Sequence, residues 1–318
     1  MPKKEQYREF CATETAVPIF SRAWWLDTLC GENNWDVCLI EKGGRIVASM
    51  PYSIQKKYGF TLVSQPPLTQ TIGPWLRPSK KKYTKKLGEQ KDLLQALIDQ
   101  LPPFDYFSQN WHYSNTNWLP FRWRGFQQTT YYTYILPDLT NEHQLWAGLR
   151  ENIRTDIRKA ENRFNLHVRD DLGMEAFLPL NRMTFTRQGR RLPYPENVIR
   201  RLDTACRAHK CRKIFIAEDA EGRHHAGMYI VWDENSAYYL MGGGDPDLRN
   251  SGATSLCMWH GIRYAATVTK QFDFEGSMIE AVERFFRAFG AVQTPYFHIT
   301  KINSPLLRLR QGIKQIVT

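Results

Sequence analysis

The stretch Tyr238-Tyr-Leu-Met-Gly-Gly-Gly-Asp245, followed by Arg249-Asn-Ser-Gly252-Ala-Thr254, indicates the fold of this chain. The first segment is typical of a β-strand that ends in consecutive glycines, and the second leads into a helix. Glycine allows close approach of the backbone, and the N–H groups at a helix N-terminus favour an anion. The pattern therefore predicts a phosphate-binding loop, although a strand–helix turn without a ligand has the same appearance.

The composition is that of a folded, basic protein. Its 318 residues suffice for two domains, and 42% hydrophobic with 13% aromatic residues can supply a core for each. The net charge of +11 and the pI near 9.3 imply attraction to polyanions. Three kinds of partner carry such negative charge: nucleic acid, the phosphates of CoA or a nucleotide, and an anionic membrane surface.

The sequence also disfavours several classes of protein. It has no apolar run of about 18 residues and no apolar signal region near the N-terminus, so we expect no transmembrane segment and a cytoplasmic location. The six cysteines lack CxxC spacing, which is typical of reduced, mostly buried thiols. His224, His225, His260 and His298 lack the spacing of metal ligands, so no metal site is predicted.

A short pattern occurs twice in the chain. Gly44, Arg45, Ala48 and Met50 reappear as Gly222, Arg223, Ala226 and Met228, 178 residues later. Each set lies in a segment with the order strand, glycine turn, strand, which predicts a β-hairpin. An offset of this length indicates two copies of one domain, which we place at residues 1–140 and 141–318.

Hydrophobic periodicity predicts alternating helices and strands. The expected helices are 22–30, 86–100, 141–164, 173–186, 195–209, 252–267 and 279–289, and the expected strands are 36–41, 45–54, 59–65, 166–170, 213–218, 224–232, 236–242, 271–274 and 296–300. The helix at 279–289 is expected to bury Ile279, Phe286 and Phe289. This alternation is typical of an α/β fold, with a mixed (α+β) sheet and helices on both faces.

The features around the loop follow a specific order. A basic helix at Leu149–Glu161 precedes the segment Thr184–Gly189 and the hairpin Ile214–Gly227, and Phe272-Asp-Phe-Glu-Gly276 precedes a helix that ends in Phe289-Gly290. This order resembles the FemABX-like branch of the Gcn5-related N-acetyltransferases (GNAT). The branch contains tandem-domain proteins and includes the peptidoglycan bridge-forming aminoacyltransferases. The resemblance covers residues 140–300 and implies two tandem GNAT-like acyltransferase domains, the second carrying the donor site.

The resemblance implies an N-acyltransferase. It would move an acyl or aminoacyl group from acyl-CoA or aminoacyl-tRNA to an amine of a cell-envelope or polysaccharide precursor, with no permanently bound cofactor. The donor-binding residues would be Gly242, Gly243 and Gly244 for the acyl arm, and Arg249, Asn250, Ser251, Gly252, Ala253 and Thr254 for its phosphate. Thr254 departs from the Gly or Ala of acetyl-CoA users, and no long helical arm for tRNA is inserted.

Two carboxylates are candidate catalytic residues. Asp273 and Glu275 are two residues apart and so are expected to point the same way along a strand. Either could accept a proton or orient the amine. The alternative is that each caps the loop before the next helix or pairs with an arginine. Asp245 is a further candidate, although an Asp before Pro246 is more typical of a turn.

Basic segments are candidate acceptor sites. Arg187, Arg190 and Arg191 follow a helix end and are expected to meet acceptor phosphates, with the segments Lys80–Lys86 and Arg187–Tyr194 as contacts for tRNA, a nucleotide-linked acceptor or anionic lipid. Solvated, solubilising faces are the alternative. Two other functions stay open: a non-catalytic anion- or nucleotide-binding protein of the same fold, and a tRNA or nucleic-acid-binding module.

Overall fold

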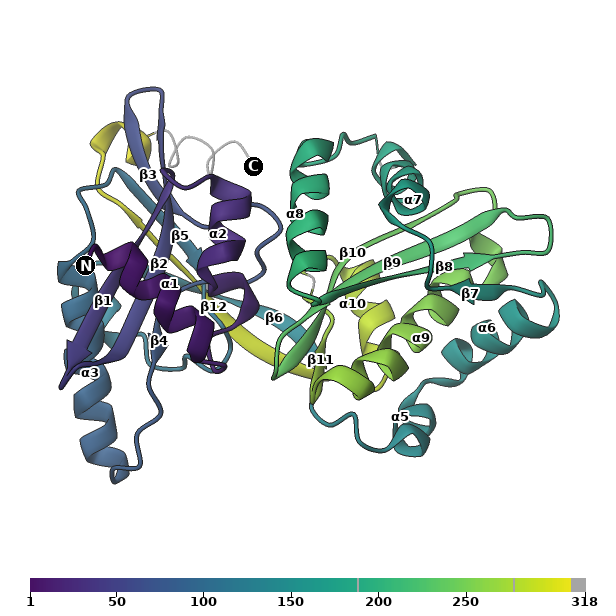
Figure 1. Ribbon diagram of the computed structural model, residues 1–318, viewed down its shortest axis with the longest axis horizontal. Helices are drawn as coiled ribbons and strands as arrows, with labels where there is room; N and C mark the ends of the chain where they lie inside the picture. The colour runs from purple at the N-terminus through teal and green to yellow at the C-terminus, as the bar shows by residue number, and fades with distance from the viewer. Residues whose placement is uncertain (188, 277, 310–318) are drawn as a thin grey trace. The chain divides into compact units, whose positions relative to one another are not determined.

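The computed structural model describes residues 1–187, 189–276 and 278–309, and the chain forms two units (Figure 1). One unit comprises Met1–Tyr131 with Pro295–Thr318, and the other comprises Tyr132–Thr294. The domain limits therefore differ from the predicted 1–140 and 141–318, since the C-terminal segment returns to the first unit. The reason is that strands β6 (Gln127–Leu136) and β12 (Val292–Ile302) each run through a unit boundary without a break.

The first unit contains a mixed sheet with helices packed on it. Its elements are α1 (Lys3–Thr13), η1 (Ile19–Ser21), α2 (Ala23–Cys30), β1 (Trp35–Lys42), β2 (Arg45–Lys57), β3 (Phe60–Ser64), β4 (Trp75–Leu76), α3 (Tyr83–Asp99), β5 (Tyr106–Asn110) and α4 (Leu119–Trp123). The strands follow the order β1-β2-β3-β5-β12, with β4 paired to β2. Only the β3–β5 pairing is parallel among these.

The second unit repeats this arrangement. Its elements are α5 (Glu142–Gly148), α6 (Glu151–Asn162), β7 (His167–Arg169), α7 (Met174–Arg187), α8 (Glu196–Ala208), β8 (Arg212–Glu218), β9 (His224–Trp232), β10 (Ser236–Gly244), η2 (Arg249–Ser251), α9 (Ala253–Val268), β11 (Gln271–Asp273) and α10 (Glu280–Arg287). The strands follow the order β6-β11-β10-β9-β8-β7. Only the β10–β11 pairing is parallel among those described.

The internal repeat seen in the sequence is also present in the topology. Hairpin β1–β2 corresponds to β8–β9, and the crossover β3–α3–β5 corresponds to β10–α9–β11. Both hairpins have an irregular register just before their turn, between Ile40 and Glu41 and between Ala217 and Glu218. The α/β fold with two tandem domains is therefore confirmed.

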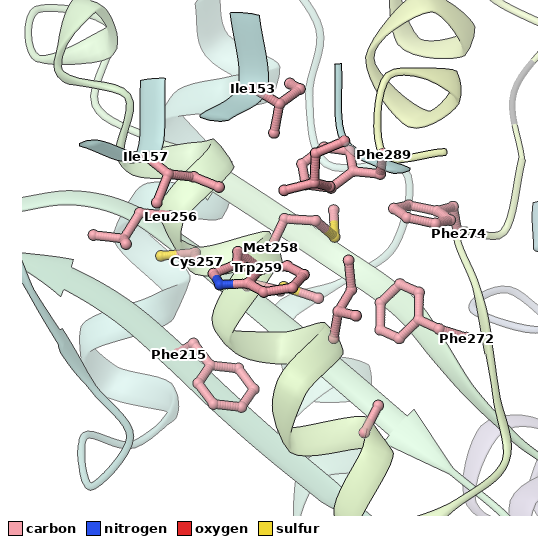
Figure 2. Close-up of a cluster of buried hydrophobic side chains, with 14 of the residues drawn as sticks. Ile153, Ile157, Phe215, Leu256, Cys257, Met258, Trp259, Phe272, Phe274 and Phe289 are labelled. Atoms are coloured by element: carbon pink, nitrogen blue, oxygen red, sulfur yellow. The ribbon is translucent and has the colours of Figure 1, made fainter. Parts of the chain in front are cut away.

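The core of the second unit lies between the sheet and helices α6 and α9 (Figure 2). Ile153 and Ile157 of α6 are each 1% exposed and belong to the same cluster as Met258 and Trp259 of α9. Helices α7 and α8 pack on the opposite face of this sheet (Figure 1), where Phe177 of α7 meets the ring of a β9 tyrosine. The strands at the centre are thus covered on both faces, which explains their continuous runs of apolar residues.

The predicted elements are present with two exceptions that have a physical cause. The single helix expected at 141–164 is broken into α5 and α6, because the N–H of Arg150 donates to the carbonyl of Ala288 instead of continuing the helix. Ile279, expected in the core, is 59% exposed because it precedes α10 instead of lying within it. None of the helices in the described residues has the length and hydrophobicity needed to cross a membrane.

Candidate functional site

Strand β10 extends beyond the end of its neighbour β11 at the glycine segment. It pairs with β11 only over Ser236–Tyr238, whereas it pairs with β9 as far as Gly244. The register with β9 shifts between Tyr239 and Met241, which is the signature of a β-bulge. Among the described residues, β10 has no pairing with β11 beyond Tyr238, and the candidate site is built around this part of β10.

Helix α7 packs directly on this part of β10. A Cβ added to Gly243 would lie 2.3–2.5 Å from backbone atoms of Leu180 and Asn181, so only glycine allows the helix to come this close. The Asn181 Nδ2 donates to the carbonyl of Gly242 at 2.7 Å, and the Thr184 hydroxyl accepts from the N–H of Gly244 at 3.2 Å. Two backbone groups of the predicted acyl-arm segment are therefore bound by α7.

Asn181 is a polar residue that the sequence analysis did not identify. It is 2% exposed, and its Oδ1 has no hydrogen-bond partner among the described residues. An unsatisfied buried acceptor costs about 1–3 kcal/mol, so such atoms are rare in native proteins and call for an explanation. Its only sequence signal is a short amide side chain inside an apolar helix, which many structural asparagines share.

Gly242 is enclosed from a second direction by Tyr239. A Cβ on Gly242 would lie 1.7 Å from the Tyr239 hydroxyl, so the ring of Tyr239 covers this glycine. Burial, followed by the charges of Cys257 and Glu275, raises the pKa of Tyr239 above its ordinary value. The hydroxyl is therefore protonated at neutral pH.

Asp273 is the last residue of β11 and is 2% exposed. Its Oδ1 accepts a hydrogen bond from the Thr133 hydroxyl and another, at 2.8 Å, from the N–H of Glu275. Burial raises the pKa of Asp273 to about 6, although both hydrogen bonds oppose the change. The alternative role considered for this residue, capping the loop before α10, is thus what its contacts show.

Glu275 lies beyond the end of the strand. Its φ is +57°, in the left-handed region, and the next residue Gly276 packs against the backbone of Tyr132 and Thr133. The prediction that Asp273 and Glu275 point the same way along one strand is therefore wrong, because β11 ends at Asp273. Burial and then the charge of Asp273 raise the pKa of Glu275 well above that of an ordinary glutamate.

The arginines of the loop that was predicted to bind the acceptor lie at the surface. Burial and then the charge of Glu275 raise the pKa of Tyr194 to about 12. Arg187, Arg190 and Arg191 are exposed, and among the described residues none of them forms an ion pair with a carboxylate. These guanidinium groups are thus accessible to a phosphorylated ligand.

The predicted phosphate loop is more enclosed than the sequence suggests. Gly252 has a φ of +83°, and a Cβ there would lie 2.2 Å from the carbonyl oxygen of Asp156 in α6. Ser251, Gly252 and Ala253 are buried, and the N–H of Ala253 donates to the Ser251 hydroxyl at 3.4 Å. Close packing of α6 is therefore sufficient to explain the glycine.

The remaining predicted donor residues lie at the surface. Arg249, Asn250 and Thr254 are exposed, which leaves them accessible to a phosphorylated ligand. Asp245, by contrast, forms a turn, because its Oδ1 accepts the N–H of Asp247 at 2.8 Å. The structure thus brings Gly242, Asp273 and Glu275 into one region. The surface residues of the predicted phosphate loop lie where strand β10 connects to helix α9.

Comparison with known proteins bears on the family of the second unit and on the fold of the chain. The acetyltransferase (GNAT) domain family matches residues 147–287. No curated protein matches the sequence. The crystal structure of FemX resembles the chain with a TM-score of 0.69 and 14% identity, over 97% of this chain and 98% of that chain.

Two further solved structures have the same fold. The C-terminal domain of a putative lysylphosphatidylglycerol synthetase from Agrobacterium fabrum gives a TM-score of 0.57 at 11% identity, over 99% of this chain and 96% of that one. A tandem GNAT protein from the clavulanic acid biosynthesis pathway gives 0.51 at 10% identity, over 95% and 94%. Residues 147–287 therefore match the acetyltransferase (GNAT) domain family, and the fold of the chain is that of the FemX structure.

Proposed function

We propose that this protein is an N-acyltransferase in which Glu275 of the second unit takes a proton from the amine acceptor. The observation that carries the proposal is a buried carboxylate with a raised pKa, located just beyond the end of β11. The neutral amine that attacks an acyl carbonyl becomes positively charged as the new C–N bond forms, and it must then lose a proton. A carboxylate whose pKa is raised toward the working pH is suited to receive that proton.

Other groups complete the proposed chemistry. Asp273 holds the backbone of Glu275 through its N–H and raises the pKa of the glutamate by its charge, so we assign it a positioning role. The oxyanion that forms on the acyl carbonyl needs fixed donors, and we assign these to the backbone of β10 at the irregularity between Tyr239 and Met241. Tyr239, protonated at neutral pH, is positioned to supply a proton to a leaving group.

The donor we favour is aminoacyl-tRNA in preference to acyl-CoA. An acyl arm that contains amides would pair with the open backbone of β10, but Asn181 and Thr184 already bind Gly242 and Gly244 there. The buried backbone of Ser251–Ala253 likewise offers little surface to a pyrophosphate, whereas Arg249 is exposed. An aminoacyl ester needs no such arm, and the net charge of +11 favours a nucleic acid.

The acceptor we propose is a phosphorylated cell-envelope or polysaccharide precursor that carries an amine. Arg187, Arg190 and Arg191 are exposed and form no ion pair with a carboxylate among the described residues, so they would bind its phosphates. The charge of Glu275 also acts on the pKa of Tyr194 in the same loop. The fold shared with FemX and with a lysylphosphatidylglycerol synthetase domain supports an envelope substrate. Contact with an anionic membrane surface and a cytoplasmic location belong to the same proposal.

Calorimetric titration tests the donor. We expect bulk aminoacyl-tRNA to bind more tightly than uncharged tRNA, and CoA and acetyl-CoA to bind weakly. Arg249→Ala removes an exposed charge and should weaken tRNA binding and reduce its salt slope by about 1, because one phosphate contact is lost. Tight binding of CoA that depends on Arg249 would overturn the choice of donor, and binding of neither ligand would favour the non-catalytic alternative.

Asp273→Asn should move the pH dependence of the reaction. The asparagine keeps an oxygen for Thr133 and for the Glu275 N–H but removes the charge that raises the pKa of Glu275. A proton acceptor works only when ionised, so the rate falls as the pH drops through its pKa. In the variant this fall should occur at lower pH, measured as kcat/KM for the amine against pH. If kcat/KM falls at the same pH in the variant as in wild type, a group other than Glu275 titrates.

A further inference from the structure

We propose that Asn181 receives the acceptor amine: its Oδ1 accepts a hydrogen bond from the amine N–H and orients the nitrogen for attack. This inference rests on the proposed acyl transfer and adds a substrate-positioning residue to that site. Asn181 lies on α7, against Gly242, in the part of β10 beyond its pairing with β11. It does not belong to the donor, carboxylate or arginine groups described above.

The orientation of the amide is fixed by its partner. The Gly242 carbonyl can only accept a hydrogen bond, so the nitrogen of the amide must face it, as the 2.7 Å contact shows. The Oδ1 is therefore turned away from Gly242, where it has no partner among the described residues although Asn181 is 2% exposed. The Oδ1 of Asn181 is therefore a rigid, desolvated hydrogen-bond acceptor. It can distinguish a ligand group that donates a hydrogen bond from an apolar group.

The same glycine connects Asn181 to the carboxylate. The Tyr239 hydroxyl covers Gly242 from another direction, and the charge of Glu275 contributes to the raised pKa of Tyr239. In addition, Tyr238, which precedes Tyr239 in β10, pairs with Asp273, and the Asp273 Oδ1 accepts the N–H of Glu275 at 2.8 Å. Asn181 and Glu275 thus adjoin one short segment of β10, as a proton acceptor and an amine-orienting group require.

The hydrogen bond that the Asn181 Oδ1 accepts becomes stronger as the amine attacks the acyl carbonyl. The nitrogen begins neutral and becomes positively charged as its bond to the acyl carbon forms, before its proton passes to Glu275. A hydrogen bond from a charged donor is stronger than one from a neutral donor, so the Oδ1 binds the transition state more tightly than the ground state. Loss of Asn181 should therefore lower kcat as well as raise the KM for the amine.

Kinetics of Asn181→Ala test the assignment. With the side-chain amine of Nα-acetyl-lysine amide as acceptor, we expect kcat/KM for the amine to fall about 10- to 100-fold, while the Kd of the donor is unchanged. Thr184→Val is the matched control. It removes the hydrogen bond between Thr184 of α7 and the N–H of Gly244, but it does not remove a buried oxygen that lacks a hydrogen-bond partner. A similar loss in both variants, or no loss in Asn181→Ala, would overturn the inference.

A second measurement separates failure of this inference from failure of the proposed function. Trifluoroethylamine, which is largely uncharged at neutral pH, is titrated into 15N-labelled protein without any donor. We expect the side-chain amide resonances of Asn181, assigned from their loss in Asn181→Ala, to shift on addition of the amine. An unshifted Asn181 amide refutes the inference even if acyl transfer occurs. A wild-type protein that transfers nothing, but shows the shift, refutes the proposed reaction and leaves an amine-binding site.

Discussion

Glu275→Gln is expected to reduce kcat for acyl transfer to an amine by about 10²–10⁴-fold, the range for loss of a general base. The substitution keeps the size of the side chain and removes the ability to take a proton at neutral pH. Because burial and the charge of Asp273 raise the pKa of Glu275, its ionised form is costly in the folded protein. The variant should therefore fold normally and unfold at a temperature no lower than wild type.

Glu283→Gln is a matched control for this experiment. Glu283 is also a carboxylate of the second unit, but it accepts hydrogen bonds from Tyr134 and Arg287, and these lower its pKa. A group that is ionised and paired at neutral pH is unsuited to accept the proton, so its loss should change kcat only slightly. Equal activity of Glu275→Gln and wild type would contradict the mechanism and favour the non-catalytic alternative.

The architecture could be predicted from the sequence because its determinants are local. The hairpin repeat depends on turn glycines, such as Gly44 and Gly222 with φ of +71° and +77°, and on alternating apolar residues beside them. The path of β6 and β12 through the unit boundaries could not be predicted, because strand pairing between residues far apart leaves no periodic signal. The domain limit was misplaced for this reason.

The site was predicted in part. The carboxylates and the glycine strand lie in segments with a recognisable order, so their proximity could be inferred from the sequence. The different surroundings of Asp273 and Glu275 could not, because they depend on where β11 ends and on the left-handed backbone of Glu275. Asn181 gave no signal, since its importance depends on a contact with Gly242, 61 residues away.

Gly252→Ala is expected to lower the free energy of unfolding by about 2–5 kcal/mol, whether or not a donor is present. A left-handed φ of +83° costs an L-residue about 1–2 kcal/mol. The added methyl group would also lie 2.2 Å from the Asp156 carbonyl, so α6 must move away from α9. Denaturation in urea measures the change, and the exposed Arg249→Ala should show little effect in the same assay.

Gly222→Ala separates these two costs. Gly222 has a similar φ of +77°, but a Cβ there meets nothing within 4 Å, so only the backbone cost remains. The difference between the two variants measures the packing of α6 on the phosphate loop. If the two variants lose equal stability, α6 does not pack tightly on Gly252 and the phosphate loop is open to a ligand. The preference for aminoacyl-tRNA over acyl-CoA then loses one of its arguments. If Gly252→Ala loses more, failure of that variant to bind a donor reflects a damaged fold, and Arg249→Ala alone reports on phosphate binding.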